Sequence, residues 1–258
     1  MDAILTAGGI PKPGEPLYEL TQGAPKALLE IAGKPMAQWV LDALSESKNV
    51  DTVVVVGVDQ DSGLSCDKPL VFTPDRGAML ANIRAGVEKV LELNQNANHV
   101  LAVSSDIPAI RGEMVDWLAN LVQESDHDIY YCVVTRQVME ARFPESKRSY
   151  IRLKDLELCG GDMNAIRART VVAREDVWER ILEARKSAPK QAAMLGYDTL
   201  LLLLLRKLDL ESSVTRVSKR LNIAGRALLC PYAEVAMDID KPHQMEILRR
   251  DLSQRVNG

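Results

Sequence analysis

A glycine pair and a downstream lysine are the first residues of this chain that could do chemistry. A predicted strand over residues 3–6 runs directly into Ala7, Gly8 and Gly9. Lys26 follows after a segment rich in proline, glycine and polar residues. Glycine lets backbone N–H groups approach an anion closely and a lysine ammonium adds positive charge, so this arrangement could cradle a triphosphate. A tight turn would use the same glycines, and both interpretations stay open on these residues alone.

Three aspartates at the ends of apolar segments form a second candidate group. Asp106 follows a predicted buried strand over residues 99–103, at the edge where open α/β sheets bind ligands, although it could also cap a helix. Asp238 and Asp240 end an apolar segment over 227–237, and period-two spacing would put both on one face if a strand continues that far. Such hard oxygen ligands suit magnesium, which takes one or two carboxylates from a protein and further ligands from substrate phosphates.

Two further glycine-containing segments could contact a ligand. Gly77 lies between Arg76 and Asn82 at a predicted helix start, where free amides can receive a base or a phosphate. Gly160 and Gly161 permit close backbone approach. The segment before them is basic, and an anionic acceptor would suit its residues Arg142, Lys147, Arg148 and Arg152. A solvated basic loop is an equal alternative.

Other familiar catalytic patterns are absent from the sequence. Neither GxxxxGK[ST] nor GxGxxG is present, which disfavours Walker ATPases and dinucleotide dehydrogenases. The four cysteines are widely separated, and the three histidines share no motif. Zinc, Ser-His-Asp and Cys-His chemistry are therefore not indicated.

The glycine and lysine motifs resemble the opening signature of the MobA-like NTP transferases, which include sugar-phosphate and molybdenum cofactor nucleotidyltransferases. That signature is L-x-A-G-G, a variable loop, then P-K-x-L-x-x-x-x-G-x-P, and it matches residues 5–9, 25–28 and 33–35. Residues 238–242 resemble the closing D-x-D/N-x-P motif. The resemblance implies an α/β fold: a three-layer Rossmann-like sandwich of the glycosyltransferase-A type, with a mostly parallel mixed sheet.

The resemblance also implies a role for each motif. Lys26 and Asp106 would be the catalytic residues, with Lys26 stabilising charge on the triphosphate. Mg²⁺, or alternatively Mn²⁺, would be held by Asp106 with Asp238, and Asp240 is the alternative partner of Asp106. The nucleotide would contact Ala7, Gly8, Gly9, Lys12, Lys26, Arg76, Gly77 and Asn82, and the acceptor would contact Gly160, Gly161, Asn164 and Arg148.

The loop after the glycine pair departs from the family pattern. Many members carry a glycine and an arginine there, whereas this chain reads Ile10-Pro11-Lys12 and has no arginine before Lys26. We expect Lys12 to substitute for that arginine. An ammonium lacks the bidentate fork of a guanidinium, so it would attract phosphate but position it less rigidly.

The expected function is that of a magnesium-dependent nucleotidyltransferase. It would move a nucleoside monophosphate from an NTP to a phosphorylated small-molecule or cofactor acceptor and release pyrophosphate. Two alternatives remain at this stage: a glycosyltransferase that uses a nucleotide-sugar donor, and a non-catalytic nucleotide-binding protein.

Hydrophobic patterning predicts the elements that must position these residues. Short apolar runs alternate with helical periodicity through the first half, as in a doubly wound sheet. The predicted strands are 3–6, 53–56, 99–103 and 129–134, with parallel pairing, and the predicted helices are 35–45, 78–93 and 112–123. Because no internal repeat or linker stands out, we expect one nucleotidyltransferase domain over 1–258, with a helical elaboration at about 165–225.

The composition narrows the class of protein. The chain has 258 residues, of which 47% are hydrophobic, and a formal net charge of -4, which argues against a nucleic-acid binder. The first residues lack the features of a signal peptide, so we expect a cytoplasmic protein. The longest apolar run, six leucines at 200–205, is too short to span a membrane. We expect it to pack in the core or against a second subunit, which would make a homodimer.

Overall fold

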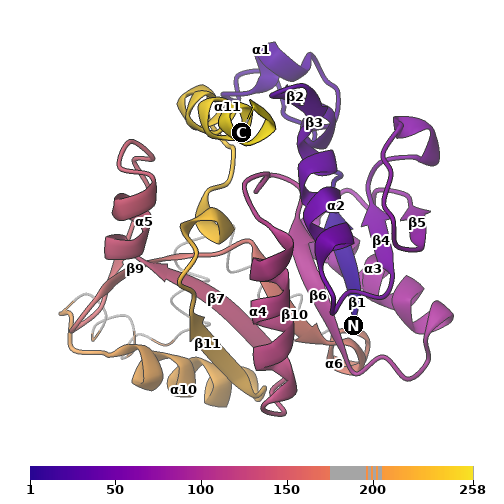
Figure 1. Ribbon diagram of the computed structural model, residues 1–258. Coiled ribbons are helices and arrows are strands. Elements are labelled where there is room, and N and C mark those ends of the chain that lie inside the picture. Colours follow the sequence, from indigo (N-terminus) through magenta and orange to yellow (C-terminus); the bar gives the residue numbers. More distant parts are fainter. Residues whose placement is uncertain (175–195, 197–198, 200–201, 203–204, 258) are drawn as a thin grey trace.

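Parallel strands form one half of the central sheet in the computed structural model, which describes residues 1–174, 196, 199, 202 and 205–257 (Figure 1). In spatial order these strands are β5 (Leu70–Thr73), β4 (Val53–Val56), β1 (Asp2–Thr6) and β6 (His99–Ser104). All four valines of β4 are fully buried, as expected of a parallel strand covered on both faces. The parallel pairing predicted for the first three apolar runs is confirmed.

The other half of the sheet is mixed in direction. Its strands are β10 (Met163–Arg167), β7 (Ile129–Thr135), β9 (Glu157–Gly160), β8 (Ile151–Arg152) and β11 (Gly225–Leu229). β10 lies between β6 and β7 and is antiparallel to both, whereas β11 pairs with β7 in parallel. Of the described strands, β11 is the one that gives the run at 129–134 its predicted parallel pairing, because β10, from later in the chain, lies antiparallel between β6 and β7.

Helices cover both faces of the sheet and give the three predicted layers (Figure 1). α2 (Met36–Glu46) and α4 (Gly112–Gln123) pack together on one face, and α3 (Met79–Leu93) and α6 (Ala168–Ala173) pack together on the other. Alternate side chains of β1 divide between these faces, because successive residues of a strand point in opposite directions. Leu5 joins the core under α2 and α4, whereas Ile4 joins the core under α3.

The segment before Asp238 is not a continuous strand. β11 ends at Leu229, and a single 3₁₀ turn, η3 (Ala233–Ala236), follows it. The expectation that Asp238 and Asp240 share a strand face is therefore wrong, because both residues follow a turn to which the two-residue alternation does not apply.

Short elements and two longer helices complete the described chain. They are α1 (Tyr18–Thr21), η1 (Lys26–Leu28), β2 (Glu30–Ile31), β3 (Lys34–Pro35), η2 (Gln60–Ser62), α5 (Arg136–Arg142), α10 (Leu210–Leu221) and α11 (Pro242–Asn257). Within the described residues, α6 and α10 belong to the predicted helical elaboration. Most of the leucine run at 200–205 lies outside the described residues, so its predicted packing stays a prediction. No helix in the described ranges is long and apolar enough to cross a membrane.

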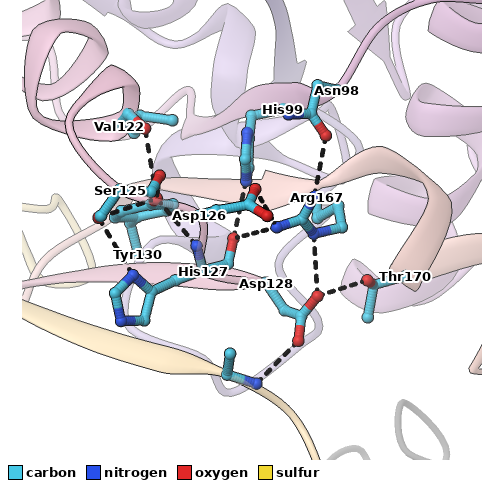
Figure 2. A network of polar contacts seen from close by, with 11 residues as sticks. Asn98, His99, Val122, Ser125, Asp126, His127, Asp128, Tyr130, Arg167 and Thr170 are labelled. Atoms are coloured by element: carbon cyan, nitrogen blue, oxygen red, sulfur yellow. Dashed lines mark hydrogen bonds and ion pairs between the residues drawn. The ribbon is translucent and has the colours of Figure 1, made fainter.

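A polar network ties together the amino ends of β6, β7 and β11 (Figure 2). Arg167, the last residue of β10, donates to Asp128 Oδ1 and to Asn98 Oδ1, both at 3.0 Å. Asp128 also accepts from the hydroxyl of Thr170 (2.8 Å) and from the N–H of Ala224 (2.7 Å). Although burial opposes its ionisation, these donors outweigh burial and lower the pKa of Asp128. This edge of the sheet is therefore held by paired charges.

Candidate active site

Close backbone packing holds the glycine turn that follows β1. The N–H of Ala7 donates to the carbonyl of Val56 on β4 (2.7 Å). Gly57 follows β4 with a φ of +108°, and a Cβ at Gly57 would lie 2.2 Å from the Cα of Gly8. No atom lies within 4 Å of the position that a Cβ of Gly9 would take. The turn is therefore tightly packed on its inner side and open on the side that a ligand could approach.

Lys26 lies at the centre of the site. Its N–H donates to the carbonyl of Gly9 (2.8 Å), which fixes the start of η1 against the glycine turn. Its Nζ donates to Asp106 Oδ2 (2.7 Å) and to Asp240 Oδ1 (2.9 Å). Burial alone would lower the pKa of Lys26, but Asp106 and Asp240 outweigh burial and raise it. The structure thus brings together residues from three motifs far apart in the sequence.

Asp106 has one carboxylate oxygen that remains unpaired. Oδ2 accepts from Lys26, whereas Oδ1 is buried and has no hydrogen-bond partner among the described residues. The backbone around it is well ordered by hydrogen bonds: the N–H of Ser105 donates to Thr6 O (3.1 Å), and the N–H of Ile239 donates to Asp106 O (2.9 Å). The closing motif is therefore attached directly to the carboxyl end of β6.

Asp162 is a site residue that the sequence reasoning missed. Its N–H donates to Val235 O (2.9 Å), and its carbonyl accepts from the N–H of Ser104 (2.9 Å), so it sits beside the carboxyl end of β6. Burial, followed by the nearby charge of Asp106, raises the pKa of Asp162 to about 7. A carboxylate directly after the pair Gly160-Gly161 was the available signal, but a carboxylate after a turn is too common to stand out.

Asp238 lies against a basic residue instead of sharing Lys26 with Asp106. The side chain of Asp238 is buried and forms an ion pair with Arg148 Nη1. Of the two predicted pairings, the structure therefore brings Asp106 together with Asp240 around Lys26, and it brings Asp238 together with the predicted acceptor residue Arg148.

A cavity of about 330 Å³ lies at the carboxyl edge of β1 and β6. Six of the predicted site residues line it: Gly8, Gly9, Lys26, Gly77, Asn82 and Asp106. The Asn82 amide donates to Asp75 Oδ1 (2.7 Å) and its Oδ1 accepts from the N–H of Arg76 (2.7 Å), so Asn82 closes the loop before α3. The Arg76 residue is exposed and does not line this cavity.

An adjoining cavity of about 430 Å³ shares Gly9 and Lys26 with the first. Asp240 and Lys241 also line it. Lys12 lines neither cavity; it is exposed, and its backbone N–H donates to Glu15 Oε2 (2.8 Å). The second cation beside Lys26 is therefore Lys241, which the sequence reasoning did not single out.

Comparison with known proteins identifies the family of this chain. Residues 20–213 match the family described as the MobA-like NTP transferase domain. The chain belongs to this family. It is thus an enzyme of the nucleotidyltransferase class. The solved structure of a hypothetical transferase from Thermus thermophilus is 32% identical, with a TM-score of 0.81 over 95% of this chain and 98% of its own.

Two solved nucleotidyltransferases share the fold of this MobA-like chain at lower identity. CMP:2-keto-3-deoxy-manno-octonic acid synthetase complexed with CTP is 17% identical, with a TM-score of 0.58 over 99% of this chain and 98% of its own. The 2-C-methyl-D-erythritol 4-phosphate cytidylyltransferase from Thermus thermophilus is 14% identical, with a TM-score of 0.55 over 98% of this chain and 100% of its own. These likenesses confirm the predicted α/β fold. No curated protein matches the chain.

Packing explains the glycine pair that was predicted to contact the acceptor in this MobA-like transferase. A Cβ at Gly160 would lie 2.2 Å from the hydroxyl of Tyr131, and a Cβ at Gly161 would lie 2.8 Å from a methyl of Val235. Asn164 donates to Gly161 O (3.0 Å) and accepts from a backbone N–H of β7, which fixes the turn between β9 and β10. The contacts of these residues are therefore with the protein itself.

The basic residues predicted to contact the acceptor pair with different carboxylates in the MobA-like fold. Arg142 forms ion pairs with Glu234 (2.9 Å) and Asp251 (2.5 Å). Of the four basic residues predicted for an anionic acceptor, Arg148 is the one that forms an ion pair with a carboxylate of the closing motif.

Proposed function

We propose that this protein transfers a nucleoside monophosphate from an NTP to a phosphorylated small-molecule or cofactor acceptor and releases pyrophosphate. The observation that carries the proposal is the Lys26 ammonium, which lines both cavities and is held between Asp106 and Asp240. An ammonium in this position would stabilise the negative charge that develops on the attacked α-phosphate and on the leaving pyrophosphate.

The two cavities suit the two parts of an NTP. The nucleoside and the α-phosphate would lie in the cavity lined by Gly8 and Gly9, and the leaving phosphates would extend past Lys26 toward Lys241. An oxygen of the acceptor phosphate would bond to the α-phosphorus, and the bond to the bridging oxygen would break as pyrophosphate leaves. Because an acceptor phosphate is already an anionic nucleophile, this reaction needs positioning more than a general base.

The carboxylates fit the magnesium ion that the family implies. Asp106 Oδ1 is a buried oxygen without a partner among the described residues, and Asp240 faces the same ammonium as Asp106. The described residues contain no group of three His, Cys, Asp or Glu side chains that could hold a metal on its own. The buried, unpaired Oδ1 of Asp106 and the nearby Asp240 support an ion held by these two residues and completed by phosphate oxygens and water. When bound, Mg²⁺ or Mn²⁺ would neutralise phosphate charge during transfer.

Nucleotide binding tests the donor half of this proposal. We expect one of ATP, GTP, CTP and UTP to bind by titration calorimetry with a strong dependence on magnesium, and the Asp106→Asn variant to lose that dependence. The matched control is Asp61→Asn, which changes an exposed aspartate on η2. Magnesium-dependent binding that survives in Asp106→Asn would contradict the assignment of Asp106 to the metal.

Pyrophosphate release tests the transfer half. We expect release only when the bound NTP is combined with a phosphorylated acceptor. Turnover of nucleotide sugars instead of NTPs would favour a glycosyltransferase, and tight NTP binding without turnover for any acceptor would favour a non-catalytic protein. A cytoplasmic location and a homodimer are further expectations, which cell fractionation and light scattering would test.

A further inference from the structure

The Lys26 ammonium lies where the two proposed metal ligands converge. Its Nζ donates to Asp106 Oδ2 at 2.7 Å and to Asp240 Oδ1 at 2.9 Å. Magnesium contacts carboxylate oxygens at about 2.0 Å, which is closer than an ammonium approaches them. A metal ion and the ammonium therefore cannot both lie between these two oxygens.

The backbone fixes the positions of both carboxylates. The N–H of Ile239 donates to Asp106 O (2.9 Å), which attaches the closing motif to the end of β6. The N–H of Asp240 donates to the side chain of Gln244 (3.0 Å), in the first turn of α11. Ligands whose segments are held in this way are preorganised. The chain thus builds the carboxylate pair with its own hydrogen bonds, and the ammonium of Lys26 occupies that pair.

Burial does not keep ions away from the carboxylate pair. The side chain of Asp240 is 61% exposed, whereas those of Lys26 and Asp106 are 17% and 15% exposed. An ion in solution can therefore reach Asp240, but it must displace the ammonium to bind both carboxylates. That displacement breaks two charge-assisted hydrogen bonds, which are stronger than neutral ones.

A triphosphate would give the ammonium alternative partners. The N–H of Lys26 is held by the carbonyl of Gly9 (2.8 Å), but a lysine ammonium is carried on a flexible four-carbon stem. The same side chain lines both cavities proposed for the nucleotide. Rotation of the stem can therefore move the ammonium from the carboxylates to phosphate oxygens while the backbone stays in place.

Charge balance favours the same exchange. Asp106, Asp240 and Lys26 together carry one excess negative charge, and a divalent ion in place of the ammonium would neutralise the two carboxylates. With both cations present the group would be positive, and cations at such short range repel each other strongly. The phosphates of an NTP supply the negative charge that allows both cations to remain in the site.

We propose that Lys26 excludes the metal ion from the carboxylate pair until a triphosphate takes over its ammonium; this inference rests on the proposed function. The metal then enters together with the nucleotide, and free Mg²⁺ does not load the protein by itself. Lys26 thereby orders the binding of metal and nucleotide, in addition to stabilising phosphate charge.

Metal titration without nucleotide tests this exclusion. Mn²⁺ is added to the whole chain, and the unbound ion is measured by electron paramagnetic resonance. We expect Lys26→Met to bind Mn²⁺ at least about tenfold more tightly than the wild type, because the two carboxylates lose their internal cation. Equal affinity in both proteins, or no binding of Mn²⁺ by the variant, would overturn the proposal.

Two further variants separate exclusion at the carboxylate pair from a general effect of charge. Lys241→Met removes the same charge from the cavity that Asp240 lines, and its Mn²⁺ affinity should rise by less than about threefold. Asp240→Asn combined with Lys26→Met should lose the gain. A gain in Lys241→Met as large as that in Lys26→Met would contradict the exclusion.

Lys26→Gln provides the same test if Lys26→Met does not fold. Its amide can still donate to a carboxylate but carries no charge. We expect the same gain of at least about tenfold in Mn²⁺ affinity, and circular dichroism checks that each variant is folded. A folded Lys26→Gln without this gain would overturn the proposal.

NTP titration and pyrophosphate release on the same samples separate this inference from the proposed function. Wild-type chain that excludes Mn²⁺ through Lys26, but neither binds NTP nor releases pyrophosphate, would contradict the proposed function alone. Wild-type chain that binds Mn²⁺ without nucleotide as tightly as Lys26→Met, and still transfers a nucleoside monophosphate, would contradict the exclusion alone.

Discussion

Aspartates lie at both edges of the sheet, but the protein pairs them with hydrogen-bond donors to different extents. At the amino ends of the strands, Asp128 accepts from Arg167, Thr170 and a backbone N–H, and its pKa is lowered. At the carboxyl ends, Asp106 keeps a buried oxygen without a described partner, and the pKa of Asp162 is raised to about 7. The amino edge is thus satisfied by the protein alone, whereas the carboxyl edge holds more negative charge than the protein neutralises.

This difference indicates that the amino edge serves stability and that the carboxyl edge serves ligands. Groups that a protein leaves incompletely paired are costly, and they cluster where a substrate or an ion completes them. The comparison can be tested by changing one residue at a time at each edge.

The largest effect is expected at the carboxyl edge, from Lys26→Met. If the proposed function holds, the variant should release pyrophosphate at least about 100-fold more slowly, because it lacks the ammonium that would stabilise charge on the transferred phosphate. Lys12→Met is the matched control, since Lys12 lines neither nucleotide cavity, and its rate should stay within about threefold of wild type. A larger loss in Lys12→Met than in Lys26→Met would reverse the assignment of these two lysines.

Gly57→Ala tests the backbone of the carboxyl edge. A methyl group at Gly57 would meet the backbone of Gly8 at 2.2 Å, and the φ of +108° disfavours any side chain. We expect the free energy of unfolding, measured by urea denaturation, to fall by about 3 kcal/mol. Gly9→Ala adds the same methyl group in open space, and its stability should change by less than about 1 kcal/mol.

Asp128→Asn tests the amino edge. We expect a loss of about 2 kcal/mol in the free energy of unfolding near neutral pH, because Arg167 loses one of its two charged partners. The pKa of Asp128 is lowered in the folded state, so its contribution is present above the unfolded pKa and disappears as the pH falls through the folded pKa. NTP affinity should stay within about twofold. An NTP affinity that falls together with stability would contradict the separation of the two edges.

Asp162→Asn should change the free energy of unfolding by a similar amount, with the opposite sign. The folded-state pKa of about 7 exceeds the ordinary value of 3.8, so ionisation of Asp162 destabilises the wild type as the pH rises through this range. Asparagine does not ionise. In urea denaturation with a chelator present, the advantage of the variant should grow by about 2 kcal/mol between about pH 5 and about pH 8. A constant difference across this range would show that Asp162 titrates normally.

Most of the strands and side chains around the proposed nucleotide site could be predicted from the sequence. The runs at Val53–Val56 and His99–Ser104 are strands, and Gly8, Gly9, Lys26 and Asp106 gather at their carboxyl edge. This succeeded because a short apolar run between turns predicts a strand locally, and parallel strands necessarily end at one edge. The resemblance to the family signature then predicted nucleotidyl transfer as the reaction.

Contacts between distant residues could not be predicted in this way. The sequence alone determined that this is an α/β protein with a glycine turn, a lysine and strand-end carboxylates, because local periodicity and residue type express these features. Only the tertiary structure decided that β10 separates β6 from β7, that Lys26 joins Asp240 with Asp106, and that Asp162 is part of the site. The partners of a buried charge come from remote segments, so its pairing and its pKa depend on how the chain packs.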